Sequence, residues 1–221
     1  CVKLFMERLK EVKLMQLSMY AKRLGHSTRE AIKNGYVNST NRLIFLDYDG
    51  TLVGFNANIE LAAPDDQVYG LLTQLTSDSN NRIVIVSGRD PKILERWFGS
   101  LNIDMISEHG AWSKLRGGSW QSVPGLSAQW KKDFFPVLES FADRTPGSVI
   151  EEKDFSLVWH YRKVDESLGE LRSNELMNTL RYLVEDKGLQ LLRGNKVVEI
   201  KNIEINKGKA MLNYMQENDF D

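Results

Sequence analysis

One stretch of sequence decides the fold: Leu43-Ile44-Phe45-Leu46-Asp47-Tyr48-Asp49-Gly50-Thr51-Leu52. Its first four residues form an apolar run that predicts a buried parallel strand. Asp47 and Asp49, two residues apart, then project the same way from the carboxyl end of that strand. Ligands of open α/β sheets bind at this end, and Gly50 permits a tight turn whose backbone N–H groups can cradle a phosphate. The stretch therefore predicts an α/β protein with an anion site beside two carboxylates.

The residues that follow alternate between helical and apolar patterns. Asp90 and Pro91 form a typical helix start, an N-cap followed by proline at the first helical position. The patterns predict helices over 65–76 and 91–98 and buried strands over 83–86 and 103–106. Such an alternation implies an α/β sheet whose strands are joined by right-handed crossovers.

After about Ala111 the pattern becomes that of an inserted, more antiparallel α+β unit. Gly117-Gly118 predicts a hairpin turn. The later patterns predict helices over 128–143 and 166–185, strands over 149–153, 156–162, 189–192 and 196–201, and a closing helix over 207–217. We therefore expect a core of residues 42–112 and 202–221, interrupted by a cap of residues 113–201.

The first 41 residues differ in pattern from the rest. Residues 2–24 have the period of an amphipathic helix that Gly25 would end, and residues 25–41 are expected to form a polar connector with one helical turn over 30–34. This basic helix could bind a membrane surface, but docking on a neighbouring domain is the favoured interpretation. The first residue is Cys1 and not Met, so we expect the chain to begin inside a longer protein.

The composition excludes several classes of protein. Of the 221 residues, 42% are apolar and 27% are charged, which is typical of a globular protein and not of a disordered or fibrous one. Cys1 is the only cysteine, so no internal disulfide can form, and this is consistent with the cytoplasm. No apolar run of about 18 residues predicts a membrane span. The net charge of −1 gives no general electrostatic indication of nucleic-acid binding.

The paired carboxylates point to phosphoryl transfer. A carboxylate at Asp47 can attack phosphorus and form an aspartyl-phosphate. A second one at Asp49 can protonate the leaving oxygen and later deprotonate water. Two other interpretations are a solvated turn at a strand end and an Asp-x-Asp that holds a metal-bound nucleotide in a glycosyltransferase. The preceding strand and the following Gly-Thr-Leu favour the phosphoryl chemistry.

Two further motifs strengthen this interpretation by their order. Ser87 follows the second predicted strand, where its hydroxyl would reach the same edge of the sheet. Lys207 opens the last predicted helix, where an ammonium can neutralise a phosphate and a carboxylate nucleophile together. Each motif alone is weak, because Ser-Gly and Lys-Gly pairs are common in loops. The succession of strand and Asp-x-Asp, strand and Ser, then Lys and helix is specific.

These motifs resemble those of the haloacid dehalogenase superfamily of phosphohydrolases. The resemblance implies that Asp47 is the nucleophile and Asp49 the acid/base, and that Ser87 and Lys207 hold the phosphate. It also implies an Mg²⁺ cofactor, with Asp47 and the backbone carbonyl of Asp49 as its ligands. The implied fold is a Rossmann-like parallel-sheet core with an α+β cap of the C2 type, inserted between the Ser and Lys motifs.

Within the superfamily, the sequence most resembles the trehalose-6-phosphate phosphatases, over about residues 42–209. The motifs that carry this resemblance are Glu108-His109-Gly110, Glu151-Glu152-Lys153, Trp159-His160-Tyr161-Arg162 and Val198-Glu199-Ile200-Lys201. Where those enzymes often have Arg-Pro after the cap glutamate, this chain has Lys201-Asn202. The resemblance implies hydrolysis of trehalose 6-phosphate to trehalose and phosphate. The N-terminal helix resembles the last helix of a trehalose-6-phosphate synthase domain, which implies a fused or associated synthase.

The predicted cap strands carry polar residues on shared faces. Glu151 and Lys153 lie on one face of their strand, and Glu199 and Lys201 on one face of theirs. The resemblance implies that Glu151, Lys153 and Glu199 grip the sugar. The alternative is that they form exposed cross-strand ion pairs of little energetic value. The further substrate-binding positions that the resemblance implies are Thr51, Gly88 and Arg89.

Other functions remain open from the sequence. One is another sugar-phosphate phosphatase, such as one for sucrose phosphate, and another is a non-catalytic, phosphatase-like regulatory domain of a synthase. The superfamily's fourth motif, an acidic cluster that binds Mg²⁺, is expected after the helix that begins at Lys207, yet no such cluster precedes Asp221. We therefore expect this chain as written to bind Mg²⁺ poorly and to be nearly inactive, and a longer natural protein to be active.

Overall fold

The computed structural model describes residues 24–54, 62–218 and 220. The helix expected over 2–24 lies outside these residues, apart from its last position. Contacts divide the chain into residues 1–40 and residues 41–221, and each unit is described by itself.

The described part of the first unit is a helix, α2 (His26–Asn38). The prediction of a polar connector with one helical turn over 30–34 was wrong, because the helix runs from His26 to Asn38. Gly25 is the N-cap of α2, and its predicted role as the end of a preceding helix concerns residues outside the described part of the chain. No residue of α2 is buried within the described structure, and its large apolar side chains Ile32, Tyr36 and Val37 are exposed. It ends where the backbone N–H and the hydroxyl of Ser39 both donate to the Gly35 carbonyl.

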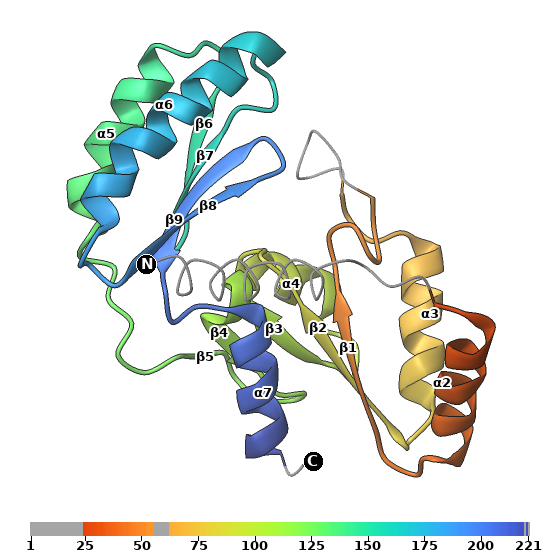
Figure 1. Ribbon diagram of the computed structural model, residues 1–221. Coiled ribbons are helices and arrows are strands. Elements are labelled where there is room, and N and C mark those ends of the chain that lie inside the picture. Colours follow the sequence, from red (N-terminus) through yellow and green to blue (C-terminus); the bar gives the residue numbers. More distant parts are fainter. Residues whose placement is uncertain (1–23, 55–61, 219, 221) are drawn as a thin grey trace, which may run out of the picture. The chain divides into compact units, whose positions relative to one another are not determined.

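The second unit contains a five-stranded sheet with the order β1-β2-β3-β4-β5 (Figure 1). Its parallel strands are β1 (Arg42–Asp47), β2 (Asn81–Val86) and β3 (Asp104–Ser107). In their register Asp47 pairs with Val86, and Val86 with Ile106. Because the three strands end level with one another, the loops that follow them meet at one edge of the sheet, as the sequence predicts.

Helices pack on both faces of this sheet. On one face α3 (Asp66–Ser77) and α4 (Pro91–Phe98) form an apolar core with Ile83 and Ile85 of β2. On the other face Val84 and Val86 pack with Tyr214 of α7 (Lys207–Glu217). This burial on both sides is the reason for the unbroken apolar run of β2. Asp65 and Asp90 cap α3 and α4 by accepting backbone N–H groups, and the Asp90-Pro91 prediction is confirmed.

The Gly117-Gly118 hairpin belongs to this first sheet. Its strands β4 (Trp112–Lys114) and β5 (Gln121–Ser122) pair antiparallel, and β4 continues the sheet beside β3. The sequence pattern placed residues from 113 onward in the inserted unit, whereas hydrogen bonding places residues 112–122 with the core. A Gly-Gly turn predicts a hairpin, but it does not indicate which sheet the hairpin will join.

A second, antiparallel sheet has the order β6-β7-β9-β8. Its strands are β6 (Val149–Glu152), β7 (Ser156–His160), β8 (Leu189–Gly194) and β9 (Val197–Asn202). The helices α5 (Lys131–Asp143) and α6 (Glu166–Val184) cover one face, with Trp159 and Val198 fully buried beneath them (Figure 1). Strand alternation turns His160 and Glu199 to the opposite face. The expected α/β fold with an inserted α+β unit is confirmed.

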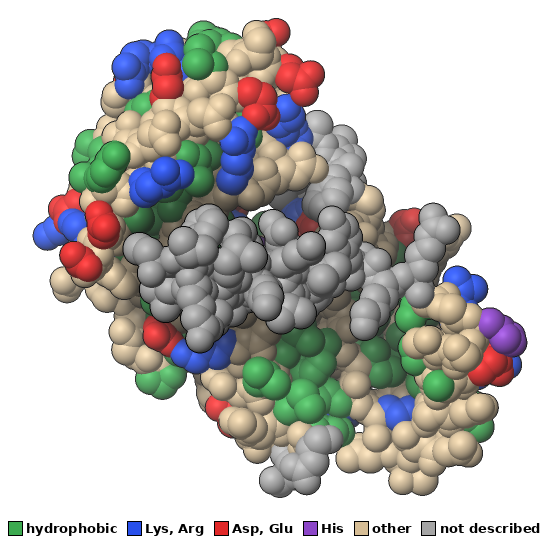
Figure 2. Space-filling view, in the orientation of Figure 1, with side chains coloured by type: hydrophobic (Ala, Val, Ile, Leu, Met, Phe, Trp, Pro, Cys, Tyr) green, Lys and Arg blue, Asp and Glu red, His purple; other side chains and the backbone are tan. Residues whose placement is uncertain are grey.

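The outer surface of the inserted unit is an ordinary solvated one. Figure 2 shows Lys and Arg side chains interspersed with Asp and Glu over the region of α5 and α6. The ion pairs of this unit include Arg172 with Glu175 at 2.7 Å and Lys196 with Glu166 at 3.1 Å, both partly exposed to solvent and of little energetic weight. Within residues 24–54, 62–218 and 220, no helix has the length and apolar character needed to cross a membrane.

Candidate active site

The two carboxylates of the opening motif lie where β1 ends. Asp47 is the last residue of the strand, and the Lys207 ammonium at the start of α7 donates to its Oδ1 at 2.5 Å. Gly50 has a φ of 86°, a left-handed conformation that glycine adopts without strain, and its N–H donates to the Val53 carbonyl. The packing of α7 on the sheet thus brings together a carboxylate and a cation that are 160 residues apart in sequence.

Asp49 is held by an arginine. The Nη2 group of Arg89 donates to Asp49 Oδ1 at 2.6 Å and its Nε group to Oδ2 at 3.1 Å, a bidentate pair. The guanidinium also lies 5.7 Å from the centre of the Tyr48 ring and 5.3 Å from that of Trp97. These contacts give Arg89 a defined position beside the motif.

Ser87 and Gly88 form the loop after β2. Ser87 is 1% exposed, and its hydroxyl accepts the N–H of Arg89 at 3.1 Å. A Cβ atom at position 88 would lie 2.5 Å from two atoms of the His109 ring, closer than any side chain can come. Only glycine therefore allows His109 to lie against this loop.

The predicted residues surround a cavity of about 290 Å³. Seven of them line it: Asp49, Gly88, Arg89, Glu151, Lys153, Glu199 and Lys207. Asp47 does not line the cavity itself, but it binds Lys207, which does. Ser87 is buried next to Gly88. Thr51 is exposed in the turn and does not line the cavity. The cavity has one wall from the strand ends of the core and another from the polar face of the cap sheet.

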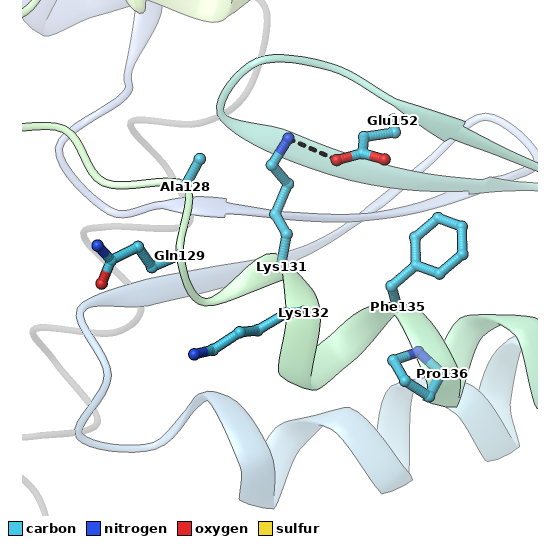
Figure 3. Close-up of a pocket in the computed structure, with 7 residues that line it drawn as sticks. All are labelled: Ala128, Gln129, Lys131, Lys132, Phe135, Pro136 and Glu152. Carbon is cyan, nitrogen blue, oxygen red and sulfur yellow. Dashed lines mark hydrogen bonds and ion pairs between the residues drawn. The ribbon is translucent and has the colours of Figure 1, made fainter.

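A larger hollow of about 570 Å³ lies on the surface of the cap, beside the start of α5 (Figure 3). Its lining includes Lys131, which donates to Glu152 at 2.9 Å, but none of the ten predicted site residues. It is therefore not the place where the chemistry of the strand ends can occur.

Glu151 lies in the cap wall of the cavity, where it contacts two other residues of the lining. Its Oε2 lies 2.7 Å from His160 Nε2, and its Oε1 lies 3.9 Å from the ammonium of Lys153. Burial acts to raise the pKa of Glu151, but the His160 hydrogen bond and the charges of Lys153 and Arg89 outweigh it and lower the pKa. This carboxylate is accordingly ionised at neutral pH and is available to accept hydrogen bonds.

Glu199 and His109 face each other across the cavity. Their Oε2 and Nε2 atoms lie 3.5 Å apart, and the other carboxylate oxygen of Glu199 has no hydrogen-bond partner among the described residues. Burial, together with the charges of Lys201, Lys153 and Lys207, lowers the pKa of His109 to about 3. His109 is therefore neutral. Burial also lowers the pKa of Lys201, which is 5% exposed.

Five cavity residues were not among the predicted site residues: His109, Val158, His160, Arg162 and Val197. His109 follows the end of β3, so the rule that selects Asp47 and Ser87 by strand ends would also have selected it. His160 lies two residues from Val158 on one strand, so alternation alone places both on the polar face of the cap.

The oxygen donors at the end of β1 limit which metal could bind. Among the described residues no group of three His, Cys, Asp or Glu side chains has the geometry to hold a metal ion. The Asp47 carboxylate and the Asp49 backbone carbonyl would supply hard oxygen ligands. Mg²⁺ suits such a pair, since it commonly binds one or two carboxylates together with substrate phosphate and retains several waters.

Comparison with known proteins agrees with this arrangement. Residues 45–221 match the model of the family described as trehalose-phosphatase. The chain belongs to the trehalose-phosphatase family. The resemblance inferred from the motifs is thereby confirmed.

The matched relatives include longer proteins. The chain is 37% identical over 194 residues to an α,α-trehalose-phosphate synthase [UDP-forming] B of Dictyostelium discoideum. The matched stretch covers 87% of this chain and 25% of the relative. The chain is 35% identical over 181 residues to a bifunctional trehalose-6-phosphate synthase/phosphatase of Thermoproteus tenax, covering 82% of this chain and 25% of the relative. The chain thus spans about a quarter of the length of these relatives.

A solved structure shows the same fold. The C-terminal domain of the C. albicans trehalose-6-phosphate phosphatase superimposes with a TM-score of 0.78 at 33% sequence identity. The match covers 82% of this chain and 63% of that one.

Proposed function

We propose that the protein hydrolyses trehalose 6-phosphate to trehalose and phosphate, as a step of trehalose biosynthesis. The observation that carries the proposal is the composition of the cavity. Its core wall holds Asp49, Arg89 and Lys207 beside Asp47, a set suited to a phosphate ester. Its cap wall holds Glu151 and Glu199, carboxylates suited to the hydroxyls of a sugar.

The proposed reaction proceeds in two displacements. An oxygen of Asp47 attacks phosphorus, the bond from phosphorus to the sugar oxygen breaks, and Asp49 gives its proton to that oxygen. Water then attacks the aspartyl-phosphate, Asp49 takes a proton from it, and phosphate leaves with the Asp47 carboxylate restored.

The surrounding groups stabilise the charge that develops on the phosphoryl oxygens. Lys207 already contacts Asp47, so its ammonium can interact with the nucleophile and with a phosphate at once. Ser87, with its hydroxyl oriented by the Arg89 N–H, and Thr51 and Gly88 are the further phosphate contacts that we propose.

Asp49 can act as an acid only after a rearrangement. In the structure both of its oxygens accept hydrogen bonds from Arg89. We propose that the substrate draws the guanidinium away, because a phosphate offers Arg89 a doubly charged partner in place of a carboxylate. Asp49 is then free to take up a proton from solvent and to face the leaving oxygen.

We propose Mg²⁺ as the cofactor, held by Asp47 and Asp49. When bound, Mg²⁺ would supply positive charge to the phosphoryl oxygens. The Asp47 carboxylate and the Asp49 backbone carbonyl fit the preference of this ion for oxygen ligands, and the Asp49 carboxylate stays available for proton transfer.

We further propose a division of labour between two parts of the chain. The core consists of residues around the first sheet and carries the reaction, and the cap, built on the second sheet, selects the sugar and excludes water. A trehalose-6-phosphate synthase domain, fused or associated, is the proposed partner, since the relatives named above are synthases or bifunctional proteins. We place the protein in the cytoplasm on the ground of its single cysteine.

The test is phosphate release by the full-length protein with millimolar Mg²⁺. The substrates are trehalose 6-phosphate, sucrose 6-phosphate and a small aryl phosphate. We expect trehalose 6-phosphate to be preferred and Asp47→Asn to lower its turnover by about a thousandfold or more. Comparable turnover of the two disaccharide phosphates would refute the specificity. An Asp47→Asn variant that keeps over about a tenth of the activity would refute the covalent mechanism. Binding of trehalose 6-phosphate without turnover would instead identify a regulatory domain.

A further inference from the structure

The turn after β3 connects several parts of the site. Its residues Glu108, His109 and Gly110 have φ values of 44°, 58° and 111°, so two non-glycine residues in succession adopt a left-handed conformation. Such a conformation persists only where the surroundings impose it. Here the N–H of Glu108 donates to the Arg89 carbonyl and the N–H of His109 to the Ser87 carbonyl, each at 3.0 Å. The turn is therefore fixed to the loop that carries the Ser motif.

The side chain of Glu108 extends from this turn to the cap. Its Oε1 accepts the backbone N–H of Asp154 and its Oε2 that of Phe155, both at 3.2 Å. These two residues form the tip of the β6–β7 hairpin. Glu108 is only 3% exposed, and burial raises its pKa. A buried carboxylate is costly unless hydrogen bonds satisfy it, and the two amides of the hairpin tip do so.

The same hairpin tip has other contacts with the core. Lys153 donates to the Gly88 carbonyl at 2.9 Å, and the rings of Phe155 and Trp112 lie 5.9 Å apart. From within the cap, Lys131 donates to the Lys153 carbonyl at 2.6 Å. Lys153 lines the cavity, whereas Glu108 does not. The Glu108 side chain therefore acts on the substrate indirectly, and its two amide contacts lead to the hairpin that carries Lys153.

We propose that Glu108 is a positioning residue that locks the tip of the cap hairpin onto the core and so holds Lys153 and Glu151 in place for the sugar. The inference deepens the proposed function and rests on it for its kinetic consequence. Because Glu108 binds amides on the cap and the Ser87–Arg89 loop on the core, it couples the sugar-binding wall to the phosphate-binding wall.

The decisive variant is Glu108→Gln in the full-length protein. The amide keeps the size of the side chain but replaces one acceptor by an NH₂ group that faces a backbone N–H. We expect kcat/KM for trehalose 6-phosphate to fall about tenfold to a hundredfold, mainly through KM, with hydrolysis of p-nitrophenyl phosphate changed less than about threefold. The matched control is Glu95→Gln, a core carboxylate that binds Lys114 and Trp120 within the first sheet. It should leave the ratio of the two activities unchanged.

Hydrogen exchange provides a readout that does not depend on activity. In Glu108→Gln the amides of Asp154 and Phe155 should exchange at least about tenfold faster, while those of β7 and β9 keep their protection. Unchanged exchange at both amides, or an equal loss on both substrates together with faster exchange throughout the cap, would overturn the proposal. If the parent protein does not hydrolyse trehalose 6-phosphate, the proposed function fails, and hydrogen exchange alone still decides the role of Glu108.

Discussion

The two sheets place functional side chains in different ways. In the parallel part of the core sheet both faces are covered, so the middles of the strands are apolar, and the polar groups of the site lie where strands end, as at Asp47 and Ser87. In the antiparallel cap sheet only one face is covered by helices, so polar residues such as Glu151, His160 and Glu199 lie along the strands on the other face. The functional groups of the core therefore lie along one edge of its sheet, whereas those of the cap are spread over one face of its sheet.

This difference predicts how substitutions in each sheet affect the choice of substrate. Residues at the core edge depend on loop backbone geometry, such as the close approach of Gly88 to His109, and must keep their positions for the reaction. Residues on the cap face are held by strand register, by contacts with one another, and by single contacts with the core, such as that of Lys153 with the Gly88 carbonyl. A change on the cap face should therefore alter which ester is accepted, whereas a change at the core edge should affect all phosphate esters alike.

The largest expected effect comes from the core edge. Lys207→Ala removes the ammonium that contacts Asp47, and we expect kcat for trehalose 6-phosphate and for p-nitrophenyl phosphate to fall equally, by about a hundredfold to a thousandfold. Lys209→Ala on the same helix is the control, because Lys209 is exposed and pairs with Glu204. A loss confined to the sugar phosphate would show that Lys207 belongs functionally to the cap.

The cap face should give a smaller and selective effect. Glu151 faces the cavity and binds His160, while its neighbour Glu152 lies on the opposite face and pairs with Lys131. We expect Glu151→Ala to lower kcat/KM for trehalose 6-phosphate about tenfold to a hundredfold and to spare p-nitrophenyl phosphate, and Glu152→Ala to change neither by more than about twofold.

The same pattern is expected for Lys153→Ala and Glu199→Ala, measured with the same two substrates. If these variants and Glu151→Ala lose both activities to the same degree, the cap face has a catalytic or structural role and not a selective one. In that case the distinction between the two sheets does not hold.

Sequence reasoning succeeded where local rules determine position. The level ends of parallel strands bring Asp47 and Ser87 to one edge, and Asp90 with Pro91 starts a helix wherever that helix packs. It failed for α2, whose helix has no buried face, and for the sheet that the Gly117-Gly118 hairpin joins.

The contact of Glu108 with Asp154 and Phe155 was beyond the reach of sequence patterns. It joins residues that are 46 and 47 positions apart and arises only when the cap lies against the core. Burial of His109 has the same origin, since its ring is covered by the Gly88 loop and by Glu199 of the cap. Such contacts depend on how the two sheets pack together, and the alternation of apolar and polar residues within a strand gives no information about that.

The burial of His109 between core and cap predicts that the stability of the protein depends on pH. The folded pKa is about 3, against about 6.5 for an unfolded histidine, so below pH 6.5 the unfolded chain binds a proton that the folded one excludes. Stability should therefore fall as the pH falls from 6.5 towards 3, by at most about 2 kcal/mol at pH 5.

The measurement compares urea unfolding of the parent and of His109→Asn at pH 8 and pH 5. Asparagine tolerates the left-handed backbone of position 109. The variant should lose less stability between the two pH values, although Lys153, Lys201, Lys207 and Glu199 still face the site. Parallel losses in the two proteins would mean that His109 is protonated without cost in the folded state.

The smallest effect concerns two helical glycines, one beside each sheet. Gly70 of α3 is exposed and has no neighbour within 4 Å of an added Cβ, so Gly70→Ala should raise the free energy of unfolding by about 0.5–1 kcal/mol through the lower entropy of the unfolded chain. Gly169 of α6 is buried, and an added Cβ would lie 2.8 Å from the ring of Tyr161, which is stacked on Trp159 and cannot move aside. Gly169→Ala should therefore destabilise the protein by about 1 kcal/mol or more. Urea unfolding of both variants gives the two signs directly, and two stabilised proteins would show that the packing of α6 on the cap sheet is looser than that of a close-packed core.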